Sequence, residues 1–167
     1  MKTLVIFAAL LGTLLANDNV DVSNSGNVGG GVHQNVNINN QDHVANINNL
    51  NGWNSWDSVC DYGRGLFATR LYARKVCIVT KMDKTVFPSL EALRAATQQT
   101  PINTTPSLFK YSSNHPVPIA NIGIYGVHIE TLCRGIPSYN AEISQVDEFY
   151  GCDVNSIITI GGISFCF

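Results

Sequence analysis

The sequence carries little charge for its length. Of 167 residues, 10 are Lys or Arg and 12 are Asp or Glu, which gives a charged fraction of 13% and a formal net charge of −2 at pH 7. Soluble domains usually carry about a quarter of charged residues. The basic excess that is typical of nucleic-acid-binding domains is missing, which argues against a nucleic-acid partner. The length predicts one domain with an appended segment.

Motifs for catalysis and metal binding are absent as well. The sequence contains no GxSxG, HExxH, GxxxxGK[ST] or EF-hand pattern, and no CxxC pair. A zinc site needs clustered ligands, whereas the four histidines are scattered along the chain, at His33, His43, His115 and His128. We therefore expect no enzymatic activity, no metal and no cofactor.

No apolar run is long enough to cross a bilayer, which takes about 20 helical residues. The run from Leu4 to Leu15 follows Lys2 and precedes the small residue Ala16, which is the layout of a secretory signal peptide. We expect residues 1–16 to be removed and the product to be soluble and secreted, without a membrane anchor. Secretion would place all cysteines in an oxidising compartment and would allow N-glycosylation at Asn103, which begins an Asn-Thr-Thr sequon.

Residues 17–49 form an asparagine-rich arm. Between Asn17 and Asn54 there are 13 asparagines, three aspartates and no Lys or Arg. Apolar residues tend to alternate with polar ones, as at Val36 and Ile38, and period-two spacing favours strands over helix. We expect a partly extended arm that adds one hairpin to a sheet, with disorder as the alternative.

The middle of the chain changes to aromatic and β-branched residues. Residues 53–82 predict two strands around a turn at Ala73-Arg74-Lys75. Pro88 begins a predicted helix with Leu90, Leu93 and Ala96 at helical spacing.

A long mobile loop is predicted over residues 97–118, which are rich in Thr, Pro, Ser and Asn. A second helix is predicted from the stripe of Tyr125, Ile129 and Leu132, and Gly135 marks its end. Residues 157–167 are apolar, uncharged and strongly β-prone, a composition that aggregates when exposed.

Five cysteines follow the predicted cleavage site: Cys60, Cys77, Cys133, Cys152 and Cys166. Two disulfides and one unpaired residue can be chosen from five in fifteen ways, so spacing alone does not give the connectivity.

An ordered series of short motifs resembles a BRICHOS domain, and nearly the whole chain resembles the gastrokines, secreted gastric mucosal proteins that contain this domain. The motifs are GWNSW (52–56), DYG (61–63), ATRL (68–71), CIVTKMDK (77–84), PSLEAL (88–93), LCRGIPSYNAE (132–142) and ISFC (163–166). The resemblance implies an α+β fold, with an antiparallel sheet of about five strands flanked by two α-helices. It assigns residues 50–141 to the BRICHOS domain and residues 142–167 to a C-terminal β-prone region.

The resemblance also implies roles for particular residues. Asp61 matches the family aspartate, which is expected to be semi-buried and pH-sensitive, and Cys77 and Cys133 match the two family cysteines and are expected to form the domain disulfide. Cys152 and Cys166 would form a second disulfide, which leaves Cys60 as a buried free thiol or an intermolecular link. A two-residue turn at residues 161–162 would place residue 156 or 157 opposite Cys166 or its neighbour, so the second pairing requires either that residues 152–155 fold back or that the turn lies elsewhere.

The implied function is non-enzymatic. A gastrokine-like protein would leave the cell through the Golgi and secretory granules, protect the gastric mucosa, chaperone β-prone or amyloidogenic segments and regulate epithelial growth. The chain's own C-terminal region is one expected client. The alternative is a structural or interaction component of the mucus layer that acts through Cys60-linked homodimers or mixed dimers, without chaperone activity.

Overall fold

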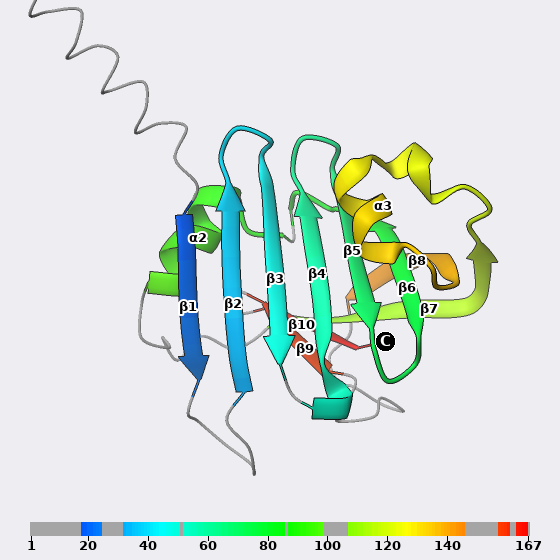
Figure 1. The fold of residues 1–167 in the computed structure, drawn as a ribbon, viewed down its shortest axis with the longest axis horizontal. Coiled ribbons are helices and arrows are strands. Elements are labelled where there is room, and N and C mark those ends of the chain that lie inside the picture. The colour runs from blue at the N-terminus through cyan, green and yellow to red at the C-terminus, as the bar shows by residue number, and fades with distance from the viewer. Residues whose placement is uncertain are drawn as a thin grey trace, which may run out of the picture.

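The computed structural model describes residues 18–24, 32–50, 52–85, 87–98, 107–145, 157–160 and 163–166. Ten strands form one sheet in the order β1-β2-β3-β4-β5-β6-β8-β7-β10-β9 (Figure 1). The strands are β1 (Asp18–Asn24), β2 (Val32–Asn39), β3 (Val44–Leu50), β4 (Trp56–Asp61), β5 (Leu66–Leu71), β6 (Val76–Lys81), β7 (Ser107–Pro118), β8 (Ser138–Gln145), β9 (Ile157–Ile160) and β10 (Ile163–Cys166). The helices are α2 (Leu90–Gln98) and α3 (Val127–Cys133), with 3-10 turns η1 (Gly52–Asn54) and η2 (Ile122–Tyr125).

The predicted α+β class is confirmed, but the sheet is larger than expected and is mixed. Strands β6 and β8 pair in parallel, as do β7 and β10, and the other neighbours are antiparallel. None of the helices in the described ranges is long and apolar enough to cross a membrane.

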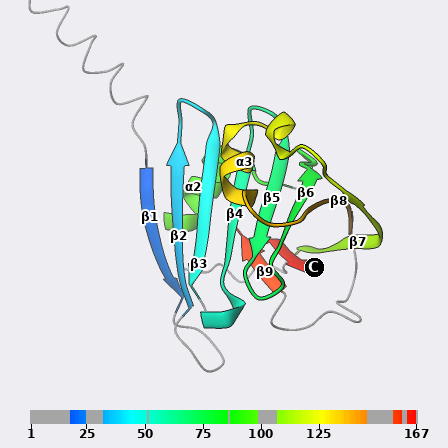
Figure 2. The ribbon, with the colours of Figure 1, turned by 45° about the vertical axis from the view of Figure 1, so that its right-hand side comes forward.

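The two helices cover opposite faces of the sheet, as Figure 2 shows. Successive side chains of a strand point to opposite faces, so the buried residues form two clusters. The α2-face cluster contains Val36, Ile38, Ala45, Ile47, Trp56, Cys60, Phe67, Leu71, Met82, Phe87 and Leu93. The α3-face cluster contains Val44, Val59, Ala68, Cys77, Val79, Ile129 and Cys133.

The asparagine-rich arm forms three strands, rather than one hairpin. Val36 pairs with Ile47, and Ile38 pairs with Ala45, and all four side chains are buried in the α2-face cluster. The alternation of apolar residues with asparagine therefore gives β2 and β3 one buried side, which compensates for the poor strand propensity of asparagine.

The segment predicted as two strands contains three, β4 to β6, with turns at residues 62–65 and 72–75. The expected loop over residues 97–118 is wrong for its second half, because β7 spans Ser107–Pro118. Pro116 lies where the β7–β8 register shifts between Ser112 and Val117, and proline is tolerated in strands at such irregularities. Pro118 is the last residue of the strand.

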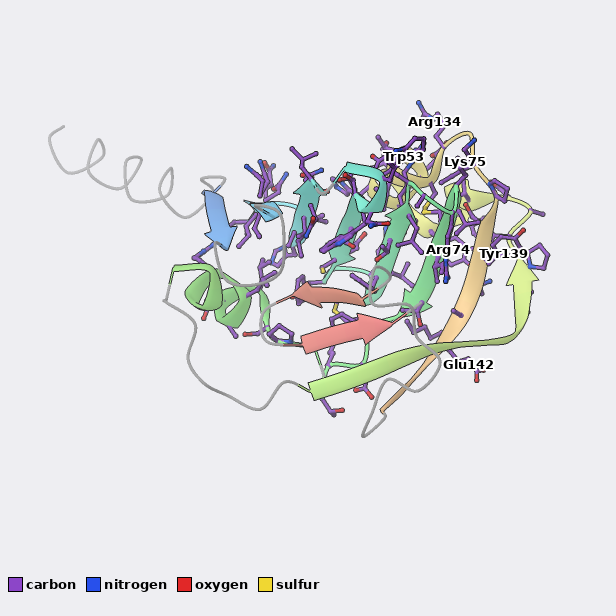
Figure 3. All side chains as sticks on the ribbon, turned by 90° about the horizontal axis from the view of Figure 1, so that it is seen from below. Trp53, Arg74, Lys75, Arg134, Tyr139 and Glu142 are labelled. Atoms are coloured by element: carbon purple, nitrogen blue, oxygen red, sulfur yellow. A yellow bond between two sulfur atoms is a disulfide. The ribbon has the colours of Figure 1, made fainter. Side chains whose placement is uncertain are left out.

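The sheet curls so that its last strands lie behind its first ones. Seen from the end of the strands in Figure 3, the red hairpin of β9 and β10 lies on the same side of the sheet as α2. Ile160 pairs with Ile163, and Ile157 pairs with Cys166, which is the register that a turn at residues 161–162 would give; those two residues lie outside the described ones. The signal peptide predicted over residues 1–16 lies outside the described residues.

Candidate functional site

The disulfide between Cys77 and Cys133 ties α3 to the sheet. Cys77 lies in β6 and Cys133 ends α3, their Cα atoms are 5.4 Å apart, and both are buried. Arg70, opposite Cys77 on β5, donates a 2.9 Å hydrogen bond to the carbonyl oxygen of Leu132. This bond satisfies a backbone acceptor at the C-terminus of the helix, where cations are favoured. Covalent and polar contacts thus fix the same end of α3.

Asp61 is the last residue of β4 and points to the α3 face. It is 3% exposed, and its Oδ1 accepts a 3.0 Å hydrogen bond from the backbone N–H of Arg64. Its Oδ2 lies 3.7 Å from Nε of Arg64, whose side chain is largely in solvent. A buried carboxylate needs such partners, because leaving it without hydrogen bonds would cost several kcal/mol.

Arg64 extends this contact to the start of α3. A Cβ atom at Gly126, the residue before α3, would lie 2.5 Å from Nε of Arg64, so the guanidinium group packs directly on the glycine backbone. Gly126 also has φ +97°, which other residues rarely adopt. Asp61 therefore positions Arg64, and Arg64 contacts the segment that begins the helix.

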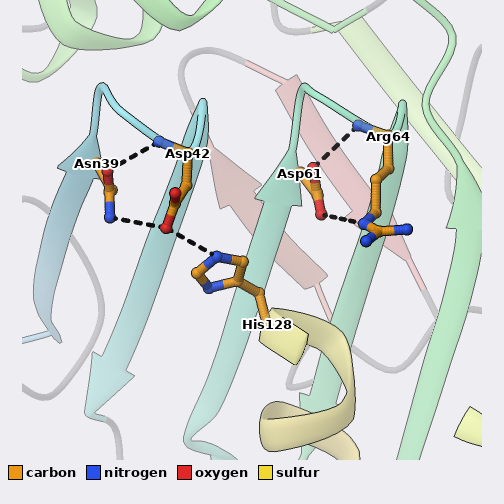
Figure 4. Close-up of polar contacts among 5 residues, drawn as sticks. All are labelled: Asn39, Asp42, Asp61, Arg64 and His128. Atoms are coloured by element: carbon orange, nitrogen blue, oxygen red, sulfur yellow. Dashed lines mark hydrogen bonds and ion pairs between the residues drawn. The ribbon is translucent and has the colours of Figure 1, made fainter. Parts of the chain in front are cut away.

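A second acidic contact meets the same helix (Figure 4). Nε2 of His128, in the first turn of α3, lies 3.2 Å from Oδ2 of Asp42 in the turn between β2 and β3. Asn39 holds Asp42, because its Oδ1 accepts from the Asp42 backbone N–H at 3.0 Å and its Nδ2 donates to Oδ2 at 3.2 Å. The contact between His128 and Asp42 is an ion pair only when the imidazole is protonated.

These contacts fix the position of the α3 segment relative to the sheet. Two sheet turns each present one aspartate, and the two aspartates reach α3 through Arg64 and His128 (Figure 4). Among the residues that the structure describes, no three His, Cys, Asp or Glu side chains lie together in a way that could hold a metal ion.

Cys60 lies next to Asp61 in sequence but on the opposite face. It is 1% exposed in the α2-face cluster, and burial raises the pKa of its thiol to about 12. The thiolate is the reactive form, so this cysteine is poorly suited to disulfide exchange in the folded state. The structure records Cys60 as a buried free thiol, which is one of the two expectations for this residue; the intermolecular disulfide stays a prediction.

Other predicted site residues fall outside these contacts. Cys152 and Asn103 lie outside the described residues, and Cys166 lies in β10, opposite Ile157. The second disulfide and the glycosylation at Asn103 stay predictions. The sequence analysis did not identify Arg64, Gly126, Asp42 or His128 as site residues. Of these, only Gly126 could have been singled out, because it is a glycine between two apolar stretches, 122–125 and 127–133.

The comparisons with known proteins agree with one another. Residues 52–140 match the BRICHOS domain family. The chain is 41% identical over 180 residues to human gastrokine-1, covering 99% of this chain and 97% of that protein, and 39% identical over 180 residues to pig gastrokine-1 with the same coverage. It is 31% identical over 180 residues to rat gastrokine-2, again with 99% and 97% coverage. No solved structure matches the chain. The chain therefore belongs to the gastrokine family and contains a BRICHOS domain.

Proposed function

We propose that this chain is a secreted gastrokine-like protein that protects mucosal epithelium, covers β-prone segments and restrains amyloid-type aggregation. Regulation of epithelial cell growth belongs to the proposal through gastrokine membership alone. The observation that supports the chaperone role is the pairing of the C-terminal hairpin with β7. Strand β10 lies parallel to β7, with Ile163 opposite Ser107 and Cys166 opposite Lys110.

The C-terminal segment is prone to aggregate unless neighbouring strands pair with it. Residues 157–167 contain no charge and no proline, and such a segment aggregates through its strand edges. In the sheet, β10 is bordered by β7 and β9 on its two sides. Other extended apolar peptides would use the same backbone edge of β7 by strand addition when the hairpin leaves it.

The test uses a fluorescently labelled peptide of residues 157–167, with fluorescence anisotropy to measure binding. The full chain binds this peptide weakly, because its own hairpin occupies β7, and a chain without residues 151–167 binds it more tightly. A control peptide with Ser164→Pro loses binding, because residue 164 lies in the strand that pairs with β7 and proline cannot donate to the strand ladder. Equal binding of both peptides contradicts strand addition.

Solubility and amyloid growth complete the test. The truncated chain stays as soluble as the full chain if the hairpin is a client; lower solubility means that the hairpin is only the last element of the fold. At a protein-to-peptide ratio well below one, the domain delays amyloid growth of an unlabelled peptide, measured by thioflavin fluorescence. Absence of delay at every ratio refutes the chaperone role.

A further inference from the structure

Two aromatic side chains line a shallow hollow at the end of the sheet. The hollow has a volume of about 280 Å³ and is bordered by Gly52, Trp53 and Tyr72. Trp53 is 85% exposed and Tyr72 is 42% exposed, although aromatic side chains bury the largest apolar areas and are usually covered. Exposed aromatic groups that gather at one place mark interaction sites.

The Tyr72 ring is held in place before any ligand arrives. Its hydroxyl donates to Oδ2 of Asp57, whose Oδ1 accepts a 2.8 Å hydrogen bond from Asn48. Its backbone N–H donates to the carbonyl oxygen of Ser55 at 3.3 Å, which ties the turn after β5 to η1. The Arg70 guanidinium carbon lies 5.3 Å from the ring centroid. A fixed ring loses little conformational entropy when a ligand binds.

Cationic side chains lie at the same border of the molecule as the exposed tryptophan (Figure 3). Lys75 is exposed in the turn that follows Tyr72, and no carboxylate among the described residues pairs with it. Arg134 follows α3, is 72% exposed, and lies 3.9 Å from Glu130, which is an exposed and therefore weak ion pair. Figure 3 shows Trp53, Lys75 and Arg134 at the same border of the molecule, whereas Arg74 points toward the other side.

Arg70 connects these groups. It contacts the Tyr72 ring on one side and donates to the carbonyl oxygen of Arg134 at 3.4 Å on the other. We call Trp53, Tyr72, Arg70, Lys75 and Arg134 the aromatic-cationic corner. Its three cations, Arg70, Lys75 and Arg134, outnumber the neighbouring carboxylates Asp57 and Glu130, whereas the whole chain has a formal net charge of −2. A patch of opposite sign to the whole chain attracts anionic partners.

We propose that the aromatic-cationic corner binds a sulfated sugar ring of a glycan. The apolar C–H face of the ring stacks on the negatively polarised face of the Trp53 indole, and the sulfate lies between Lys75 and Arg134. The hollow is at the small end of ligand sites, so it fits one ring better than an extended peptide. A sulfate presents three oxygens and can contact cations from two elements at once.

The site is independent of strand addition at β7. The corner lies at the turn between β5 and β6 and at the end of α3, whereas β7 borders β8 and β10. Failure of glycan binding therefore leaves the chaperone proposal intact, and failure of the chaperone test leaves this proposal intact.

The experiment measures binding of a heparin-derived tetrasaccharide to the full chain by isothermal titration calorimetry. Trp53→Ala is expected to weaken binding about tenfold or more, the effect of losing an aromatic anchor. Because Trp53 is exposed, its truncation leaves the fold intact, which circular dichroism verifies. Lys75→Ala and Arg134→Ala each weaken binding about threefold and reduce its salt dependence.

Arg74→Ala is the matched control. It removes the same charge from the same turn, but its side chain points away from the corner (Figure 3). Its affinity stays within about twofold of the unchanged chain. An equal loss for Arg74→Ala and Lys75→Ala, with no loss for Trp53→Ala, means unspecific charge attraction and overturns the proposal.

Two other ligands distinguish a sulfated glycan from a neutral glycan and from an anionic membrane. A desulfated tetrasaccharide binds weakly if sulfate is recognised, and equal affinity overturns the sulfate assignment. Vesicles that contain phosphatidylserine test whether the corner is a membrane surface. Binding to vesicles that depends on Trp53, without binding to the tetrasaccharide, overturns the glycan and assigns the corner to anionic lipid.

Discussion

Replacing Cys77 and Cys133 together by alanine measures how far the α3-face disulfide holds the fold. The bond joins residues 56 apart in sequence. In the chain-entropy model a cross-link of this span stabilises the folded state by about 4 kcal/mol, because it restricts the unfolded chain. Domains of this kind have a total unfolding free energy of about 5–15 kcal/mol, so the loss is a large part of the total.

Alanine also removes two buried sulfur atoms, and a second variant corrects for that. Cys60→Ala removes one sulfur that is buried to the same degree and is not cross-linked. The destabilisation of the Cys77→Ala/Cys133→Ala variant in excess of twice that of Cys60→Ala is the contribution of the cross-link. We expect this excess to be about 4 kcal/mol.

Urea unfolding, followed by circular dichroism, is the assay. With a slope of about 1–3 kcal/mol per molar urea, the cross-link contribution lowers the unfolding midpoint by about 1–4 M. Hydrogen exchange adds a local readout. Helices shorter than about 12 residues are marginal alone, so the amides of α3, which spans Val127–Cys133, lose protection first. An excess below about 1 kcal/mol, or α3 amides as protected as before, refutes the reasoning.

Three further changes test the contacts around α3 and the opposite face. Asp61→Ala removes the acceptor of the Arg64 amide and lowers stability by about 1–3 kcal/mol in urea unfolding. Asp61→Asn keeps a side-chain acceptor for the Arg64 amide and costs less than Asp61→Ala; an equal cost for the two substitutions contradicts a role for this hydrogen bond. Gly126→Ala costs about 2 kcal/mol because φ is +97° and the new methyl meets Arg64, whereas Gly135→Ala, with positive φ but open space, costs about 1 kcal/mol. Because the folded pKa of Cys60 is about 12 and its unfolded value is 9.0, stability is retained below pH 9 and falls by up to about 4 kcal/mol as the pH rises to 12. Cys60→Ala lacks this fall, and identical alkaline profiles for the two proteins refute the burial argument.

Local patterns in the sequence were sufficient to predict several elements of the fold. The helical spacing at Leu90 and Leu93 corresponds to α2, where Leu93 is buried against the sheet. Gly135 has φ +79° directly after α3, as a helix-ending glycine requires. The register considered for a two-residue turn at residues 161–162, with residue 157 opposite Cys166, is the one between β9 and β10.

Contacts between distant segments could not be predicted in this way. Strand β7 was taken for a loop because its prolines and polar residues outweigh its apolar ones, and its strand conformation depends on β8 and β10 as neighbours. The contact of His128 with Asp42 joins two turns that no local pattern relates. Cys60 and Asp61 are adjacent in sequence, yet the pleat sends one to each face, and this separation follows from the strand assignment alone.

The two outermost strands of the sheet are unlike. Strand β1 has the sequence DNVDVSN, with two aspartates, and β9 has the sequence IITI, with no charge. Charged residues on an edge strand oppose pairing with another chain, so of these two described edge strands β9 is the one that favours pairing. A fibre needs two complementary edges on every copy, whereas pairing of β9 with β9 uses the same strand twice and closes by two-fold symmetry. Pairing through β9 would therefore close at two copies rather than grow into a fibre.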